Sequence, residues 1–288
     1  PDSMHAKRSA KSSGVPEGAP ARPIPQTRMP LALRSITAPF EPTPTTRARW
    51  FSAHPSCHHR AQLSLDAVSY HYRYAYLHGF GSSPSSKKGQ HLERMFSGFG
   101  IELLVPDLNR PSFSRLSPVA ILHELESLLG RDPSGPRVRL IGSSLGGWLA
   151  TLFAAEHPAL VDRMVLIAPA FDFGQRWRER LGEAGIERWL ADGDALFPNA
   201  DGAQVPVHAK FLLEACELPQ RPIVSMPTLI LHGVNDDVIP IDSSRRYAHE
   251  APQVELIELP ADHALSDHEA RVAAEAQRFF ELGRATLD

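Results

Sequence analysis

The sequence predicts an α/β fold, in which a mainly parallel sheet is covered by helices on both faces and carries a small helical lid insertion. From about residue 73 onward, short apolar runs alternate with amphipathic helical patterns. The runs are apolar at consecutive positions, which is typical of strands buried on both faces. With 42% hydrophobic residues in a chain of 288, there is enough apolar surface for such a core.

The first half of the pattern contains three strands and two helices. An apolar run at 74–80 ends in His-Gly-Phe and is followed by a polar loop and an amphipathic helix at 87–99. A second run at 101–107 precedes a helix at 118–129, whose apolar residues recur at helical spacing. The third run, at 138–142, turns directly into the next helix. We therefore expect consecutive strands to be joined by helical crossovers.

The second half adds three strands, two helices and one irregular interval. A helix at 145–157 and a strand at 163–170 are followed by strands at 227–233 and 254–260 and by a final helix at 268–282. Because strands and helices alternate, the sheet is expected to be mainly parallel. Ligands of such open sheets gather at the carboxyl ends of the strands, so candidate site residues are sought there.

The irregular interval, at about 171–225, is too long for a structureless loop in a compact domain. It contains two amphipathic patterns, so we expect a small helical insertion, which is a lid if it lies over the strand ends. Ordinary core packing of its apolar side chains stays an alternative to a ligand-facing role. The candidate inner-face residues are Trp177, Leu181 and Trp189.

Residues 1–62 differ in composition from residues 63–288, the expected α/β domain. The first segment carries nine basic and three acidic residues and is rich in Pro and Ser, whereas the rest carries 21 basic and 30 acidic residues. It shows no apolar period, so it is predicted to be a disordered basic leader. An organelle transit segment, a dispensable tail and an over-extended start before Met29 are the open alternatives.

Two cysteines do not supply a disulfide framework, and this usage fits a reducing, cytoplasmic compartment, with an organelle as the alternative. A His/Cys cluster in the leader matches no established zinc pattern and is interpreted as a polar linker. The basic leader lacks the aromatic interleaving of a nucleic-acid-binding segment. The His/Cys cluster of the leader consists of His54, Cys57, His58 and His59.

The longest uncharged apolar run, Met164 to Phe171, is too short to span a bilayer.

The turn between the run at 138–142 and the following helix carries the clearest chemical signal. Gly142, Ser144 and Gly146 fit G-x-S-x-G, and this strand-turn-helix position is where a nucleophile elbow occurs. Glycines are needed because a Cβ at either flank would crowd the strained serine. The backbone N–H of Leu145 is predicted to point into the cleft, where it can stabilise an oxyanion. A tight turn lined with small residues is the alternative.

A serine nucleophile needs a base and a carboxylate. His263 follows the last predicted strand on a loop that can reach the carboxyl edge of the sheet, so it is the predicted base, whereas His268 falls in the final helix. Asp236 and Asp237 follow the penultimate strand, and at least one of them is expected to face solvent.

The chain order Ser, Asp, His is that of the nucleophile-elbow hydrolases, and the sequence resembles the α/β-hydrolase superfamily over roughly 72–284. The loop YLHGFGSSPSSKK resembles the corresponding loop of the small bacterial YqiA-like esterases. GSSLGGW is similar both to that group and to thioesterase-like serine hydrolases. The resemblance implies the α/β-hydrolase fold, although the insertion is longer than a minimal esterase needs.

The resemblance also assigns roles. The HGxxDxxxP form of the superfamily favours Asp236 over Asp237 as the triad acid, with Asp172 as the alternative because some members carry the acid one strand earlier. The residue after the His-Gly pair donates an oxyanion N–H in such enzymes, which here is Phe80. His78 is expected to support this loop by hydrogen bonds.

The resulting prediction is a serine esterase acting on a small-molecule acyl ester, without a metal or an organic cofactor. Thioesterase, acyltransferase and peptidase activities on the same triad stay open, as does a binding protein without turnover. No nucleic-acid partner and no membrane span are expected, and a homodimer is left open.

Overall fold

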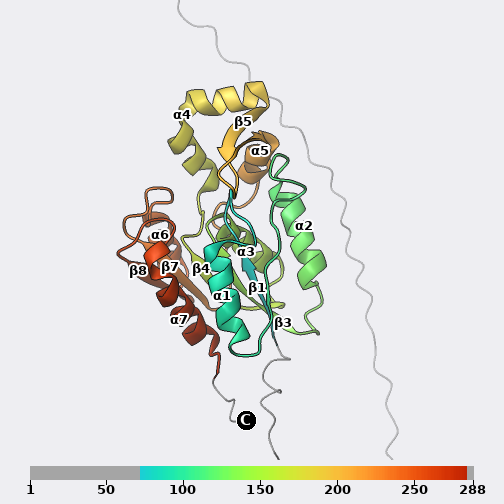
Figure 1. Ribbon diagram of the computed structural model, residues 1–288, viewed down its shortest axis with the longest axis vertical. Helices are drawn as coiled ribbons and strands as arrows, with labels where there is room; N and C mark the ends of the chain where they lie inside the picture. Colours follow the sequence, from blue (N-terminus) through green and yellow to red (C-terminus); the bar gives the residue numbers. More distant parts are fainter. Residues whose placement is uncertain (1–71, 284–288) are drawn as a thin grey trace, which may run out of the picture. The chain divides into compact units, whose positions relative to one another are not determined.

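A computed structural model describes residues 72–283, and a six-stranded sheet forms its centre (Figure 1). The strands are β1 (Tyr72–Leu77), β2 (Leu103–Leu104), β3 (Arg137–Ser143), β4 (Val161–Ile167), β7 (Thr228–Gly233) and β8 (Val254–Leu259). Their order in space is β2-β1-β3-β4-β7-β8, and all neighbouring strands pair in parallel. All six predicted apolar runs form these strands, so the predicted fold class is confirmed. The leader and its His/Cys cluster lie outside the described residues.

Helices cover both faces of the sheet because successive strand side chains point to opposite faces. Tyr74 and Tyr76 of β1 pack in one buried cluster, whereas Ala75 and Leu77 pack in the other. Two helices that lie side by side cover the sheet at the first cluster, and three others contribute to the second, which also contains residues of the 171–225 interval (Figure 1). The first pair is α1 (Lys87–Ser97) and α7 (Glu269–Phe280); the other three are α2 (Pro118–Leu129), α3 (Leu145–Glu156) and α6 (Asp242–Glu250).

Local signals explain where α1 and α2 begin. The Ser86 hydroxyl accepts a hydrogen bond from the backbone N–H of Gly89 at 3.2 Å, and the Ser117 hydroxyl accepts one from Ala120 N–H at 3.1 Å. Each serine therefore satisfies a donor that the first turn of a helix leaves unpaired. Pro118 follows as the first residue of α2, where its missing N–H is not needed.

The interval at 171–225 contains both expected helices and, between them, a hairpin that the sequence analysis did not predict. The elements are α4 (Phe173–Asp192), β5 (Asp194–Pro198), β6 (Gln204–His208) and α5 (Lys210–Glu217). β5 and β6 pair antiparallel as an isolated two-stranded sheet. Their prolines argue against a strand in a central position but are tolerated in an isolated hairpin, whose strands are both edges. α4 is bent at Gly182, whose φ of 68° and ψ of 166° are not helical.

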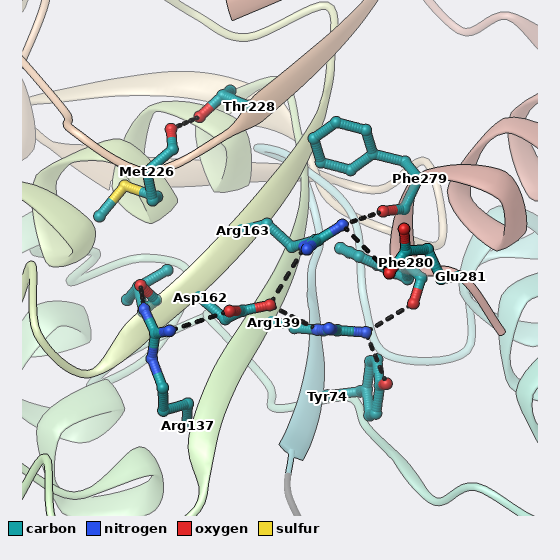
Figure 2. A network of polar contacts seen from close by, with 11 residues as sticks. Tyr74, Arg137, Arg139, Asp162, Arg163, Met226, Thr228, Phe279, Phe280 and Glu281 are labelled. Atoms are coloured by element: carbon teal, nitrogen blue, oxygen red, sulfur yellow. Dashed lines mark hydrogen bonds and ion pairs between the residues drawn. The ribbon is translucent and has the colours of Figure 1, made fainter. Parts of the chain in front are cut away.

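An ion-pair network joins β3, β4 and α7 near the amino ends of the two strands (Figure 2). The Asp162 carboxylate accepts hydrogen bonds from Arg139 Nε at 2.7 Å and from Arg163 Nε at 3.1 Å. Arg137 contacts its other oxygen at 3.0 Å. Arg139 also donates to the carbonyl oxygen of Phe280, so the network anchors the carboxyl end of α7 to the sheet.

The helix α6 was not predicted, because Tyr247 is its only large buried apolar residue and no apolar period results. Its other two buried residues are Ser243 and Ser244. Within the described part of the chain, no helix combines the length and the hydropathy that a bilayer crossing requires.

Candidate active site

Ser144 occupies a strained turn at the carboxyl end of β3. Its φ of 52° and ψ of −116° lie in a region that residues with a Cβ rarely adopt. The surrounding backbone holds this conformation, because Ser144 N–H donates to Ile167 O at 2.9 Å and Ser144 O accepts from Ala170 N–H at 3.0 Å. The turn therefore projects the hydroxyl from the edge of the sheet, at the N-terminus of α3.

The flanking glycines are required by close backbone approaches. A Cβ on Gly146 would lie 2.1 Å from the carbonyl oxygen of Leu77, and a Cβ on Gly142 would lie 2.5 Å from Gly146 O. Neither approach leaves room for a methyl group. The elbow thus packs directly against the end of β1, which brings the loop after β1 beside Ser144.

His263 lies between the serine and an aspartate. Its Nε2 is 3.0 Å from Ser144 Oγ, and its Nδ1 is 2.7 Å from Asp236 Oδ2. Since the carboxylate can only accept, Nδ1 carries the proton and Nε2 is left to accept the serine proton. The loop of His263 packs against the end of β7 at Gly233, where a Cβ would lie 2.2 Å from Ala261 O.

The Asp236 carboxylate is fully buried but well supplied with donors. Its Oδ1 accepts from the backbone N–H groups of Val238 at 2.9 Å and Ile239 at 2.8 Å. Burial alone would raise the pKa of this carboxyl, but hydrogen bonds from His232, His263 and Ile239 outweigh it and hold the pKa well below its usual range. Asp236 is therefore a carboxylate throughout the physiological pH range.

The two predicted oxyanion donors belong to segments that lie next to Ser144. Leu145 N–H follows Ser144 directly, and Phe80 N–H belongs to the loop that passes beside it, where a Cβ on Gly79 would lie 3.9 Å from Ser144 Oγ. Among residues 72–283, neither amide donates an intramolecular hydrogen bond. Both are thus available to an oxygen beside Ser144.

His78 supports this loop through two defined contacts. The ring is 1% exposed; its Nδ1 is 2.9 Å from Gly79 O, and its Nε2 accepts from Leu108 N–H at 3.0 Å. These partners require the proton on Nδ1, which makes the ring neutral. Burial also favours the neutral ring, because it lowers the pKa of His78; the nearby charge of Asp107 opposes this shift but does not cancel it.

The alternative residues lie elsewhere. Asp172 is bound by two arginines, with Arg221 Nε 3.0 Å from Oδ1 and Arg246 3.1 Å from Oδ2. Asp237 is exposed, and His268 lies in a short 3₁₀ helix that precedes α7. None of these side chains contacts Ser144 or His263 among the hydrogen bonds of residues 72–283.

The insertion covers the loop after β1. The Phe80 ring packs within 5.2–5.6 Å of four aromatic rings, and three of them belong to the insertion. Trp177 and Trp189, two of the candidate inner-face residues, are buried in this aromatic group, and Leu181 is partly buried against the same core. The residues around Phe80 are Phe113, Trp177, Phe197 and Phe211.

Within residues 72–283, one group of possible metal ligands occurs, on α2 and at the carboxyl end of α3. Glu126, Glu156 and His157 each bring one donor atom within 4.8 Å of the others. Arg131 already pairs with Glu126, whose pKa its hydrogen bond lowers, and His157 contacts the same carboxylate at 3.1 Å. The group is therefore an ion-paired helix surface.

Two residues that contact this site were not among the residues predicted from the sequence. His232 lies 3.1 Å from Asp236 Oδ2, and Lys88 Nζ donates to Ser143 Oγ at 3.2 Å. The four-residue spacing of the HGxxD segment was a signal for His232. Lys88 gave no signal, because its contact with β3 arises only when α1 packs across the sheet.

Lys88 makes stability depend on pH in a defined direction. Burial lowers the pKa of its ammonium from 10.5 to about 8, although the charges of Glu269, Asp262 and Asp236 partly oppose this. Between pH 8 and 10.5 the unfolded chain therefore binds more protons here than the native one, and the free energy of unfolding rises with pH. We therefore expect the free energy of unfolding of the native protein, measured relative to that of Lys88→Met, to rise by about 1–3 kcal/mol across this window. Urea unfolding of both proteins at pH 7.5 and pH 10.5 measures this change. If the two proteins differed in unfolding free energy by the same amount at both pH values, the lowered pKa of Lys88 would be contradicted.

Comparisons with known proteins agree with this architecture. The model of the uncharacterised protein family UPF0227 matches residues 73–280. The human palmitoyl-protein thioesterase ABHD10, mitochondrial, is 30% identical over 161 residues, which cover 52% of this chain and 50% of the relative. The chain thus spans about half the length of the curated relatives it matches.

Solved structures share the fold at low sequence identity. The mouse α/β-hydrolase domain-containing protein 10 has a TM-score of 0.61 at 21% identity, covering 73% of this chain and 90% of that one. Est1E of Butyrivibrio proteoclasticus, with ferulic acid bound, has a TM-score of 0.61 at 16% identity, covering 72% and 87%. The predicted resemblance is confirmed: the chain belongs to the uncharacterised protein family UPF0227, the family of YqiA-like esterases, and has the α/β-hydrolase fold.

Proposed function

We propose that this protein is a serine hydrolase that cleaves carboxylic esters through an acyl-enzyme on Ser144. The observation that carries the proposal is the continuous contact from Ser144 Oγ to His263 Nε2, at 3.0 Å, and from His263 Nδ1 to Asp236, at 2.7 Å. Both distances lie within the reach of direct proton transfer or hydrogen bonding.

In the first half-reaction, His263 takes the proton of Ser144 as Oγ attacks the ester carbonyl carbon. The carbonyl oxygen becomes an oxyanion, which the N–H groups of Phe80 and Leu145 stabilise. Asp236 stabilises the imidazolium that forms. The tetrahedral intermediate then breaks its bond to the alcohol oxygen, which takes the proton from His263 and leaves an acyl-enzyme.

In the second half-reaction, His263 removes a proton from water as the water oxygen attacks the acyl carbon. A second oxyanion forms between the same two N–H groups and collapses to release the carboxylic acid. The proton returns from His263 to Ser144, so the protein ends in its starting state.

The insertion at 171–225 is part of this proposal as a lid on the α/β domain at 63–288. Its aromatic side chains surround the Phe80 ring, so it covers the loop that supplies one oxyanion donor. The bend at Gly182 divides α4 into two segments. A lid in this position would restrict which acyl groups reach Ser144.

Hydrolysis of an acyl-thioester is the second candidate function. It is favoured by the 30% identity to a relative named as a palmitoyl-protein thioesterase, and the same attack and oxyanion chemistry would serve it. The two candidates differ in the leaving group and not in the proposed catalytic residues.

The test is labelling with a fluorophosphonate probe combined with hydrolysis assays. We expect the native protein and Ser143→Ala, its matched neighbour, to be labelled and Ser144→Ala to be unlabelled and inactive. Labelling of Ser144→Ala at the native rate would refute the proposed nucleophile. The kcat/KM values for p-nitrophenyl esters and for thioesters of the same acyl groups then decide between the two leaving groups.

A further inference from the structure

His232 lies behind the Asp236 carboxylate and is fully buried at the carboxyl end of β7. Its Nε2 is 3.1 Å from Asp236 Oδ2 and 2.8 Å from Ile239 O. On the other side of the ring, Nδ1 is 2.8 Å from the hydroxyl oxygen of Ser244 on α6. Both ring nitrogens therefore have partners, and one partner is the carboxylate that His263 also contacts.

The partners assign the proton on the ring. A carboxylate and a backbone carbonyl can only accept hydrogen bonds, so Nε2 carries a proton and donates to Asp236 and Ile239. In the neutral ring, Nδ1 then accepts the hydroxyl proton of Ser244. His232 is thus held by its partners as a donor at a fixed position.

Asp236 Oδ2 consequently receives hydrogen bonds from two imidazoles, His263 at 2.7 Å and His232 at 3.1 Å. We propose that His232 is a positioning residue of the site, which fixes the Asp236 carboxylate and moderates the negative charge that it presents to His263. The inference rests on the proposed function, because it assigns His232 an effect on the base of that reaction.

The direction of the effect follows from electrostatics. A second donor on Oδ2 disperses the carboxylate charge and weakens its attraction for the imidazolium form of His263. Without this donor, His263 holds its proton to higher pH, so the acidic limb of the kcat/KM profile moves upward. The carboxylate also loses one of its four hydrogen bonds, which lowers the rate because His263 is held less firmly.

Other charged groups lie near this pair and are unchanged in the test variants. Lys88 of α1 interacts with Asp236, and Asp262 of the His263 loop and Glu269 of α7 interact with Lys88. Glu258 of β8 interacts with His232. Their contribution is common to all proteins compared, so it cancels in the difference between profiles. These groups are Lys88, Asp262, Glu269 and Glu258.

Two amide substitutions separate positioning from simple packing. His232→Gln can place an N–H near the position of Nε2, whereas the shorter His232→Asn places its amide near Nδ1 and leaves Asp236 without this donor. For p-nitrophenyl acetate, we expect His232→Asn to lose about 10–100-fold in kcat/KM, the effect of one hydrogen bond to a charged group, and its acidic limb to move up by about half to one pH unit. We expect His232→Gln to stay within about threefold of the native value with an unmoved limb.

An unmoved limb in His232→Asn, or equal shifts in both variants, would overturn the inference. Should His232→Asn not fold, NMR of the native protein labelled with ¹⁵N-histidine tests the same claim: the His232 signal must show a proton on Nε2, and a proton on Nδ1 alone overturns the inference. Inactivity of Ser144→Ala tests the proposed function separately, because it does not depend on either His232 variant.

Discussion

We expect replacement of His263 by alanine to lower kcat for the proposed ester hydrolysis by a factor of about 10⁴–10⁶. His263 Nε2 is the side-chain atom that contacts Ser144 Oγ among the described residues, so the variant has no base to take the serine proton. The proposed oxyanion donors are backbone groups that the substitution retains, so the variant should still hydrolyse the ester faster than the uncatalysed reaction in water. The effect is measured as kcat on p-nitrophenyl esters together with the rate of fluorophosphonate labelling.

His268→Ala is the matched control for this prediction. His268 lies five residues later, in the 3₁₀ helix before α7, and does not contact Ser144. It should retain the native kcat. A His263→Ala protein with more than about a tenth of native kcat would show that another group acts as the base.

We expect replacement of Asp162 by asparagine to lower the free energy of unfolding by about 3–5 kcal/mol, the usual effect of removing one partner from a buried ion pair. Asp162 is the one carboxylate that contacts all three arginines of the network in Figure 2, and Arg139 is 5% exposed. Without the carboxylate, the Arg139 charge stays buried between Tyr74 and α7 with only neutral partners. Urea unfolding at pH 7 measures the loss.

The control is Glu183→Gln, which removes an exposed pair with Arg178 at 2.8 Å. Surface pairs of this kind contribute about 0–1 kcal/mol, so its unfolding curve should stay close to that of the native protein. Asp162→Asn within 1 kcal/mol of the native protein would mean that the network does not hold α7 to the sheet.

The six strands of the sheet were predicted from short, mainly apolar runs that alternate with helical patterns, a signal that does not depend on distant residues; the run at 254–260 is interrupted by two acidic residues, Glu255 and Glu258. β5, β6 and α6 were not predicted, because their own residues lack such a pattern. The hairpin strands contain prolines and are mostly exposed, and α6 buries two serines and Tyr247, so neither shows a clear apolar period. Elements that are stabilised mainly by contacts with other segments show no local sequence pattern from which they can be predicted.

The candidate site residues likewise differ in whether a local sequence pattern was enough to identify them. Ser144 was identified from a local strand-turn-helix pattern, and its strained φ of 52° is a property of that turn. The choice of Asp236 over Asp237 and Asp172 came from a family resemblance, and the structure places only Asp236 against His263. The catalytic roles themselves stay predictions until the variants are measured.

The sequence by itself determined the α/β fold, the elbow at Ser144 and the loops that carry His263 and Asp236, because periodicity, glycine spacing and chain order are local properties. Only the tertiary structure decided that Ser144 and His263, 119 positions apart, lie within hydrogen-bond distance, that His232 contacts the same carboxylate oxygen as His263, and that Lys88 lies against Ser143. The physical reason is that hydrogen bonds and pKa shifts depend on distance and burial, and both are fixed only when the helices and loops pack across the sheet.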